Sequence, residues 1–156
     1  MPLFKKRASR KLVEEAVENH EQKNLQQAKE LFLKAIETYD KNPEAHLLYG
    51  DLLKDMNEMK PAENEYKRAI EIKPDFAEAH GALGELLHRL GRIYEAETAY
   101  KKSIELKPHY VNSSLNLATL YMDLAAFESM KKVYREVLPY VEDEGLKRRI
   151  EEKLRY

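Results

Sequence analysis

The sequence predicts an all-α protein built from stacked pairs of helices, on three observations. A 34-residue segment repeats along the chain, apolar residues recur at three- and four-residue spacing within each copy, and no stretch shows the alternation typical of a strand. One such helix pair cannot bury its apolar stripe alone, whereas stacked pairs bury a continuous one. With 156 residues, 43% of them apolar, the chain is long enough to form one domain with such a core.

The repeat is clearest in the middle of the chain, where the copy beginning at Pro43 aligns with the copy beginning at Ala77. The positions that match include Gly50 with Gly84, Tyr66 with Tyr100, and Pro74 with Pro108. Extending this period predicts units at 9–42, 43–76, 77–110 and 111–144, of which the first and last are degenerate. Residues 1–8 remain as a basic N-terminal tail, and residues 145–156 as a C-terminal capping helix.

Each element follows from its apolar residues, taken in chain order. The first unit carries Ala16, Ala28, Phe32, Ala35 and Ile36 at repeat positions, and the fourth carries Leu117, Ala118, Tyr121, Phe127, Tyr134 and Val137. In the third unit, the segments AEAHGALGELLHRL and YEAETAYKKSIEL read as two helices separated by Gly91 and Arg92. Pro108 ends the second helix, because proline disfavours helical geometry in the residue before it. Beyond the repeats, one apolar stripe suits a helix that covers the last unit; it consists of Leu146, Ile150 and Leu154.

This pattern resembles the tetratricopeptide repeat family over most of the chain. The residues that carry the resemblance in the third unit are His80, Leu83, Gly84 and Leu87 in the first helix, then Ala96, Tyr100, Ser103 and Pro108. The departures are His46 and His80 in place of an aromatic residue, Glu15 in the first unit, and Ala118, Ala125 and Met130 in the fourth. The resemblance implies a right-handed superhelix (α-solenoid) of four antiparallel helix pairs plus the capping helix. It also implies a non-catalytic protein–protein interaction scaffold, whose first helices line a concave groove that holds a peptide or helix of a partner.

The glycines divide into three roles. Gly50 and Gly84 are expected where the paired helix approaches closely, and Gly91 where the turn needs a conformation that glycine favours. Gly81 has leucine at its equivalent positions, so the fold gives no reason for it. We therefore expect Gly81 to leave room for a ligand, and Gly81→Leu to preserve the fold while weakening partner binding.

No catalytic, cofactor-binding or metal site is predicted. The chain has no cysteine, and it lacks the loop and nucleophile motifs of nucleotide-binding proteins and hydrolases. His46 and His80 are interpreted as packing residues. The same holds for five tyrosines at repeat core positions, which are Tyr49, Tyr66, Tyr100, Tyr121 and Tyr134.

Charge and hydropathy give no general reason to expect nucleic acid or a membrane as a partner. The 27 basic residues nearly balance the 28 acidic ones, and no stretch has the roughly 18 apolar residues of a membrane span. The N-terminal segment is not followed by the apolar run of a secretory signal, so a cytoplasmic location is expected. The basic segments at both ends leave contact with RNA or acidic lipid as an alternative.

By repeat position, the groove side of the first unit presents Arg10, Val13, Glu14, Val17, His20 and Glu21. The candidate groove residues of the other three units are Glu44, Leu47, Leu48, Asp51, Lys54, Asp55, Glu78, Gly81, Ala82, Glu85, His88, Arg89, Asn112, Leu115, Asn116, Thr119, Met122 and Asp123. Over the four units, eight carboxylates stand against three fixed cations.

This acidic excess predicts a partner with Lys or Arg flanking apolar residues. Members of the family that grip acidic chaperone tails use Lys, Asn and Arg on this side. The corresponding residues here are Arg10, Glu14, Leu48, Glu78 and Ala82, or, one unit later, Glu44, Leu48, Ala82, Asn112 and Asn116. Neither set forms a carboxylate clamp, so acidic tails are not expected to bind. The alternatives are self-assembly through the terminal repeats and, less favoured, an RNA-associated helical repeat.

Overall fold

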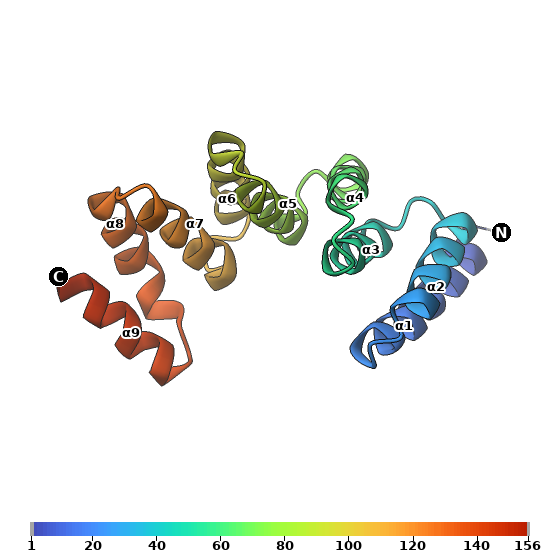
Figure 1. The fold of residues 1–156 in the computed structure, drawn as a ribbon. Helices are drawn as coiled ribbons and strands as arrows, with labels where there is room; N and C mark the ends of the chain where they lie inside the picture. The colour runs from blue at the N-terminus through green and yellow to red at the C-terminus, as the bar shows by residue number, and fades with distance from the viewer. Residues whose placement is uncertain (1, 156) are drawn as a thin grey trace. The chain divides into compact units, whose positions relative to one another are not determined.

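The computed structural model describes residues 2–155, and within them every regular element is helical (Figure 1). The α-helices are α1 (Pro2–Glu21), α2 (Leu25–Thr38), α3 (Pro43–Asp55), α4 (Met59–Ile72), α5 (Ala77–Arg89), α6 (Ile93–Leu106), α7 (Val111–Asp123), α8 (Phe127–Val137) and α9 (Glu144–Arg155). A short 3-10 helix, Leu138–Tyr140, follows α8. The all-α expectation is confirmed for this part of the chain.

The expected N-terminal tail is helical wherever it is described, which corrects the expectation of a separate tail. Residues 2–8 are the first two turns of α1. Leucine, lysine and arginine are good helix formers, and the proline stands at the first helical position, where its missing N–H costs nothing. The outermost residues of the expected tail and cap, 1 and 156, lie outside the described residues.

The chain forms two compact units, residues 2–82 and 83–155, and the division falls within α5. In the first compact unit, α1 packs against α2, and α3 packs against α4. Phe32 of α2 lies 6.0 Å from Tyr49 of α3, measured between ring centroids, and this contact joins the two pairs. Tyr66 of α4 is fully buried.

The second unit has two apolar clusters. The first joins Leu87, Tyr100 and Leu120, from α5, α6 and α7. The second joins α7, α8 and α9, with Tyr134 and Ile150 buried in it. The helix α9 therefore covers the last helix pair with the apolar stripe that was read from the sequence.

Close approach explains two of the glycines. A Cβ atom built on Gly50 would lie 2.6 Å from Cε1 of Tyr66, and one built on Gly84 would lie 2.7 Å from Cδ1 of Tyr100. Real Cβ atoms essentially never lie so close to a neighbouring atom. The tyrosine of the second helix thus occupies the space that a side chain on the first would need.

The turn between the two helices of each pair has the same backbone conformation throughout. Its central residue has a positive φ in all four turns: Lys23 (65°), Asn57 (63°), Gly91 (74°) and Ala125 (53°). In each turn the next residue donates its N–H to a carbonyl five residues back, as Arg92 does to Leu87 at 2.9 Å. This is the Schellman ending of a helix, and it confirms the turn role expected for Gly91.

Candidate functional site

The best-formed part of the candidate surface is a stripe along α3. It consists of Glu44, Leu48, Asp51 and Asp55, whose spacing places them on one side of the helix. Glu44 and Asp55 are exposed, and Leu48 and Asp51 are half-buried. The start of α3 is fixed by Pro43 and by the Asn42 side chain, which accepts the Ala45 N–H at 3.4 Å. Below, this set is called the α3 stripe.

Internal partners satisfy part of the charge on this stripe. Asp51 accepts a hydrogen bond from the Tyr66 hydroxyl at 2.7 Å, and the Nζ atom of Lys54 lies 3.8 Å from the same carboxylate oxygen. Asp51 is thus held between α3 and α4, and its charge is already engaged within the fold. The exposed carboxylates Glu44 and Asp55 are the ends of the stripe that face solvent.

A histidine–aspartate pair recurs between first helices of neighbouring repeats. Nε2 of His20 in α1 lies 2.8 Å from Oδ2 of Asp55 in α3, and Nε2 of His88 in α5 lies 3.1 Å from Oδ2 of Asp123 in α7. Each pair lies within one compact unit. His20 and His88 therefore position the carboxylates beside them and are not isolated groups in a groove.

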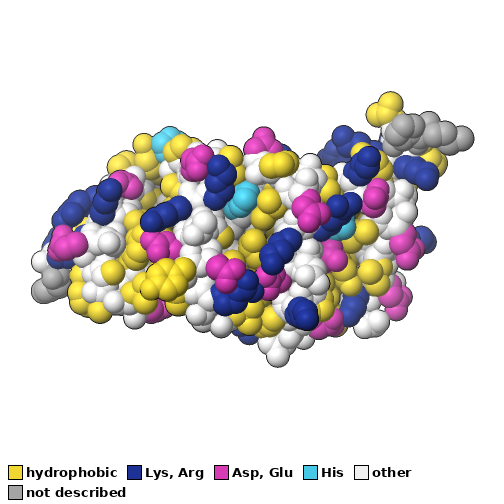
Figure 2. All heavy atoms as spheres, turned by 90° about the horizontal axis from the view of Figure 1, so that it is seen from above, with side chains coloured by type: hydrophobic (Ala, Val, Ile, Leu, Met, Phe, Trp, Pro, Cys, Tyr) yellow, Lys and Arg dark blue, Asp and Glu magenta, His cyan; other side chains and the backbone are white. Residues whose placement is uncertain are grey.

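The acidic excess belongs almost entirely to the first compact unit. Six of the eight carboxylates lie in residues 2–82, where the cations of the set are Arg10 and Lys54. Both cations already lie near carboxylates, since Nε of Arg10 is 3.3 Å from Oε1 of Glu14. In the second unit only Glu85 and Asp123 remain, against Arg89. On the face drawn in Figure 2, acidic and basic side chains are interspersed.

In the second unit, the apolar residues of the candidate groove are partly covered. Leu115 and Met122 pack against the cluster that contains Ile150 of α9. Nζ of Lys153 lies 3.3 Å from Sδ of Met122. The remaining predicted residues of this unit are exposed or half-buried; they are Glu85, His88, Arg89, Asn112, Asn116, Thr119 and Asp123.

Three of the predicted groove residues are buried: Val13, Leu47 and Gly81. They occupy the same repeat position, one in each of the first three repeats. A first helix in a stack is flanked on more than one side, so packing covers more of its circumference than a single helix pair would. Gly81 is buried, and its expected role in leaving room for a ligand stays a prediction. Glu78 and Ala82, beside it in α5, are half-buried.

The histidines and tyrosines at repeat core positions behave largely as expected. His46 is buried, with Nδ1 2.6 Å from Oε2 of Glu65 and Nε2 3.0 Å from the Asp40 carbonyl oxygen. Of the five tyrosines, Tyr121 alone is half-buried, and the other four are buried. The Tyr121 hydroxyl donates to Oε1 of Glu97 at 2.7 Å. These residues serve packing and internal hydrogen bonds.

Comparison with known proteins identifies the repeat. Family models described as tetratricopeptide repeat match residues 20–86 and 77–110, which together exceed half of the chain. This chain belongs to the tetratricopeptide repeat family. No curated protein matches it.

Solved structures of other tetratricopeptide repeat proteins share the fold. The first TPR of Spaghetti (RPAP3), bound to the HSP90 peptide SRMEEVD, is 19% identical with a TM-score of 0.71, over 75% of this chain and 93% of that one. The Arabidopsis OM64 TPR domain is 18% identical with a TM-score of 0.72, over 76% and 98%. A MamA protein is 16% identical with a TM-score of 0.73, over 94% and 88%. The α-solenoid class is thereby confirmed.

Two features of this tetratricopeptide repeat protein were not predicted from its sequence. A cavity of about 650 Å³ lies against α7, α8 and α9, with Met122, Phe127 and Met130 on its apolar side. Phe127 falls on a repeat position, yet it is exposed.

The second feature is the Glu97 carboxylate, which accepts hydrogen bonds from both Tyr121 and Lys101. The hydrogen bond from Lys101, followed by that from Tyr121, lowers the pKa of Glu97. Only the four-residue spacing of Glu97 and Lys101 was visible in the sequence.

Within residues 2–155, no three His, Asp or Glu side chains are placed to hold a metal ion together. A search of the same residues for a helix long and apolar enough to cross a membrane found none.

Proposed function

We propose that this protein is a non-catalytic interaction scaffold that binds a basic and apolar peptide or helix on the first-helix face of residues 2–82. Tetratricopeptide repeat folds generally mediate protein–protein interaction, and one of the structural neighbours is bound to a peptide. The charge of this chain's own surface supports the choice of partner. Its carboxylate excess lies almost entirely in the first compact unit, so we place the binding site there.

The observation that carries the proposal is the α3 stripe. Two exposed carboxylates, Glu44 and Asp55, stand at its ends, and the half-buried Leu48 lies between them. Eleven residues of helix separate the two carboxylates by about 16 Å. A partner with two cations at that spacing and leucine-like side chains between them would match the stripe in both charge and apolar character.

An acidic tail such as SRMEEVD lacks this complementarity. In the first compact unit, only one of the five positions that correspond to an acidic-tail clamp carries a cation. That cation is Arg10, and it lies beside Glu14. The remaining positions hold Glu14, Leu48, Glu78 and Ala82. Carboxylates facing carboxylates raise the free energy of the complex, so we expect no binding of the acidic peptide.

Fluorescence anisotropy with labelled peptides tests the proposal. The probe is a helical peptide with a lysine near each end, about 16 Å apart, and leucines between them. A matched peptide with glutamates for lysines and the peptide SRMEEVD serve as comparisons. We expect saturable binding of the lysine peptide only, weakened about tenfold or more by Glu44→Lys with Asp55→Lys.

The matched control is Glu30→Lys with Glu37→Lys, which makes the same change of charge at two exposed positions of α2. The control should retain the affinity of the unmodified chain. Tighter binding of SRMEEVD than of the lysine peptide would refute the proposed partner chemistry. An equal loss of affinity in the control would show that net charge, and not the α3 stripe, governs binding.

A further inference from the structure

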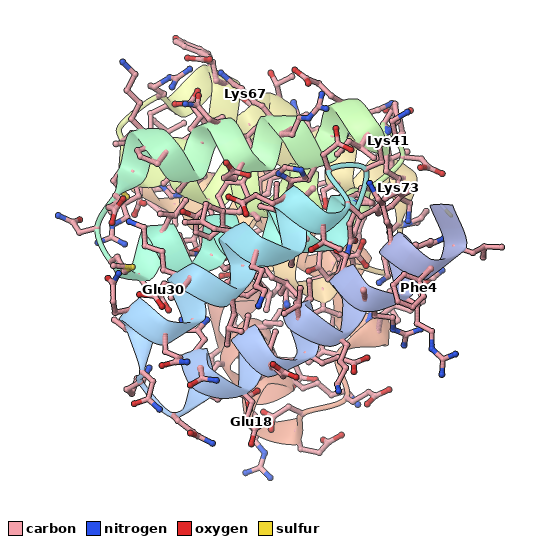
Figure 3. The ribbon with its side chains drawn as sticks, turned by 90° about the vertical axis from the view of Figure 1, so that its right-hand side faces the viewer. Phe4, Glu18, Glu30, Lys41, Lys67 and Lys73 are labelled. Carbon is pink, nitrogen blue, oxygen red and sulfur yellow. The ribbon has the colours of Figure 1, made fainter. Side chains whose placement is uncertain are left out.

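The beginning of α1 combines exposed apolar side chains with an unbroken group of cations. Leu3 is 83% exposed and Phe4 is 77% exposed. Between residues 5 and 11 the chain carries five cations and no carboxylate: Lys5, Lys6, Arg7, Arg10 and Lys11. The second half of α1 has the opposite character, with carboxylates at Glu14, Glu15, Glu18 and Glu21. In Figure 3, Phe4 lies near one end of α1 and Glu18 near the other.

Four of these side chains share the outward face of the helix. At about 100° per residue, Leu3, Phe4, Arg7 and Lys11 fall within an arc of about 100°. The opposite side of α1 carries Ser9, Val13 and Ala16, which are buried. Phe4, Arg7 and Lys11 also line one surface hollow, together with Arg10 and Glu14. Around the N-terminal end in Figure 2, dark blue Lys and Arg side chains gather beside exposed hydrophobic atoms. We call these four outward residues, together with the exposed Lys6 beside Arg7 in the chain, the α1 tip.

The fold does not account for this composition. Cations in the first turns of a helix are opposed by the helix dipole, and the first turn of α1 has no acidic residue to offset them. Leu3 and Phe4 are exposed, so they contribute nothing to the core. A contiguous apolar pair bordered by charge marks a surface that meets a partner.

We propose that the α1 tip docks on an anionic lipid surface. Leu3 and Phe4 would enter the boundary between headgroups and acyl chains, and the cations behind them would lie among anionic headgroups. The carboxylates that begin at Glu14 are repelled by the same surface, so contact is limited to the first turns of the helix. The balanced total charge conceals this feature, because the acidic half of α1 offsets the basic half in the sum.

Leu3 is the side chain of the α1 tip that favours lipid over RNA. RNA would reward the cations and the Phe4 ring, which can stack on a base, but it has no apolar layer for Leu3. A lipid surface accepts both apolar side chains and the cations together. The α1 tip includes no residue of the α3 stripe, so a test of lipid binding is independent of the proposed peptide binding.

Flotation of the full chain with vesicles tests the proposal. The vesicles contain phosphatidylcholine alone or phosphatidylcholine with phosphatidylserine, and single-stranded RNA is added in a separate arm. We expect binding only to vesicles with phosphatidylserine. Each Lys or Arg near such a surface strengthens binding about fivefold, so Lys6→Glu, Arg7→Glu and Lys11→Glu together should weaken it more than a hundredfold. Leu3→Ala with Phe4→Ala should weaken it about tenfold.

The matched control is Lys34→Glu, Lys41→Glu and Lys60→Glu, at three exposed lysines elsewhere in the first compact unit. It should lower binding far less than the α1 tip variant does. Circular dichroism should show the same helix content in all variants, because the substituted side chains are exposed. Four results would overturn the proposal: no vesicle binding, binding indifferent to Leu3→Ala with Phe4→Ala, an equal loss in the control, or displacement from vesicles by RNA.

Discussion

Replacing Gly84 with alanine sets two effects of opposite sign against each other. Gly84 lies inside α5, and alanine in a helix interior is more favourable than glycine by about 1 kcal/mol. On helix propensity alone, Gly84→Ala would stabilise the protein. The packing against α6 predicts the reverse, so the sign of the measured change decides between the two.

The structure sets the size of the packing cost. The added methyl carbon would lie 2.7 Å from Cδ1, 2.9 Å from Cε1 and 3.1 Å from Cγ of Tyr100. Tyr100 is 1% exposed, and its ring also contacts His88 edge-on at 6.5 Å between centroids, so the ring has little freedom to move. Overpacking a core of this kind costs about 1–3 kcal/mol. After the gain in propensity, the variant should be less stable than the unmodified chain by about 1 kcal/mol.

Urea unfolding followed by circular dichroism measures the change in unfolding free energy. The same substitution is then made in a Tyr100→Leu background, where the ring is gone and the methyl group has space. In that background Gly84→Ala should stabilise by up to about 1 kcal/mol relative to its own parent. If Gly84→Ala stabilises the unmodified chain, or costs the same in both backgrounds, the close approach of Tyr100 is not the reason for the glycine.

Three further predictions concern the turns, the cap and a paired carboxylate. Ala125→Gly should stabilise the protein by about 0.5–1 kcal/mol and Gly91→Ala should destabilise it by a similar amount, both in urea unfolding, because both residues have positive φ. Ile150→Ala should lower the unfolding free energy by about 2–4 kcal/mol, because Ile150 of α9 is buried in a cluster with residues of α7 and α8. An unchanged value would mean that α9 does not cap the fold. The hydrogen bond from Lys101 holds the pKa of Glu97 below its ordinary value of 4.5, so the stabilisation is present above that value and lost as the pH falls through the lowered pKa. Lys101→Met should raise the Glu97 titration midpoint in carbon-13 NMR, and an unmoved midpoint would contradict this cause.

The helices, the turns and the two packing glycines could be predicted from the sequence because the residues that determine them recur in more than one repeat. Gly50 and Gly84 stand at one repeat position, and Tyr66 and Tyr100 at another, so a single packing rule explains all four. The turn conformation is likewise repeated, although only Gly91 is a residue type that indicates a positive φ. At Ala125 the hydrogen-bonded turn imposes a positive φ on a residue that does not favour it.

At the beginning of the chain, helix propensity decides the structure and the basic composition does not. A basic segment outside the repeat suggested a tail, whereas its residues favour a helix that continues directly into α1. Val13, Leu47 and Gly81 are buried although their shared repeat position lies on the predicted groove side. A repeat position indicates the side of a helix, but neighbouring helices decide how much of that side remains open.

The internal charge pairs reduce the number of carboxylates that are available to a partner. His20 and Asp55 are 35 residues apart, as are His88 and Asp123, which is one repeat and one residue in both cases. At the corresponding positions between these two pairs stand Lys54 and Arg89, two cations that cannot form such a pair with each other. A count of eight carboxylates treats every one as available to a partner, yet Asp55 and Asp123 already face histidines and Asp51 already accepts from Tyr66. Within residues 2–155, Glu44 makes no contact of this kind, so charge reversal at Glu44 alone should weaken the binding of a basic peptide more than charge reversal at Asp51 does.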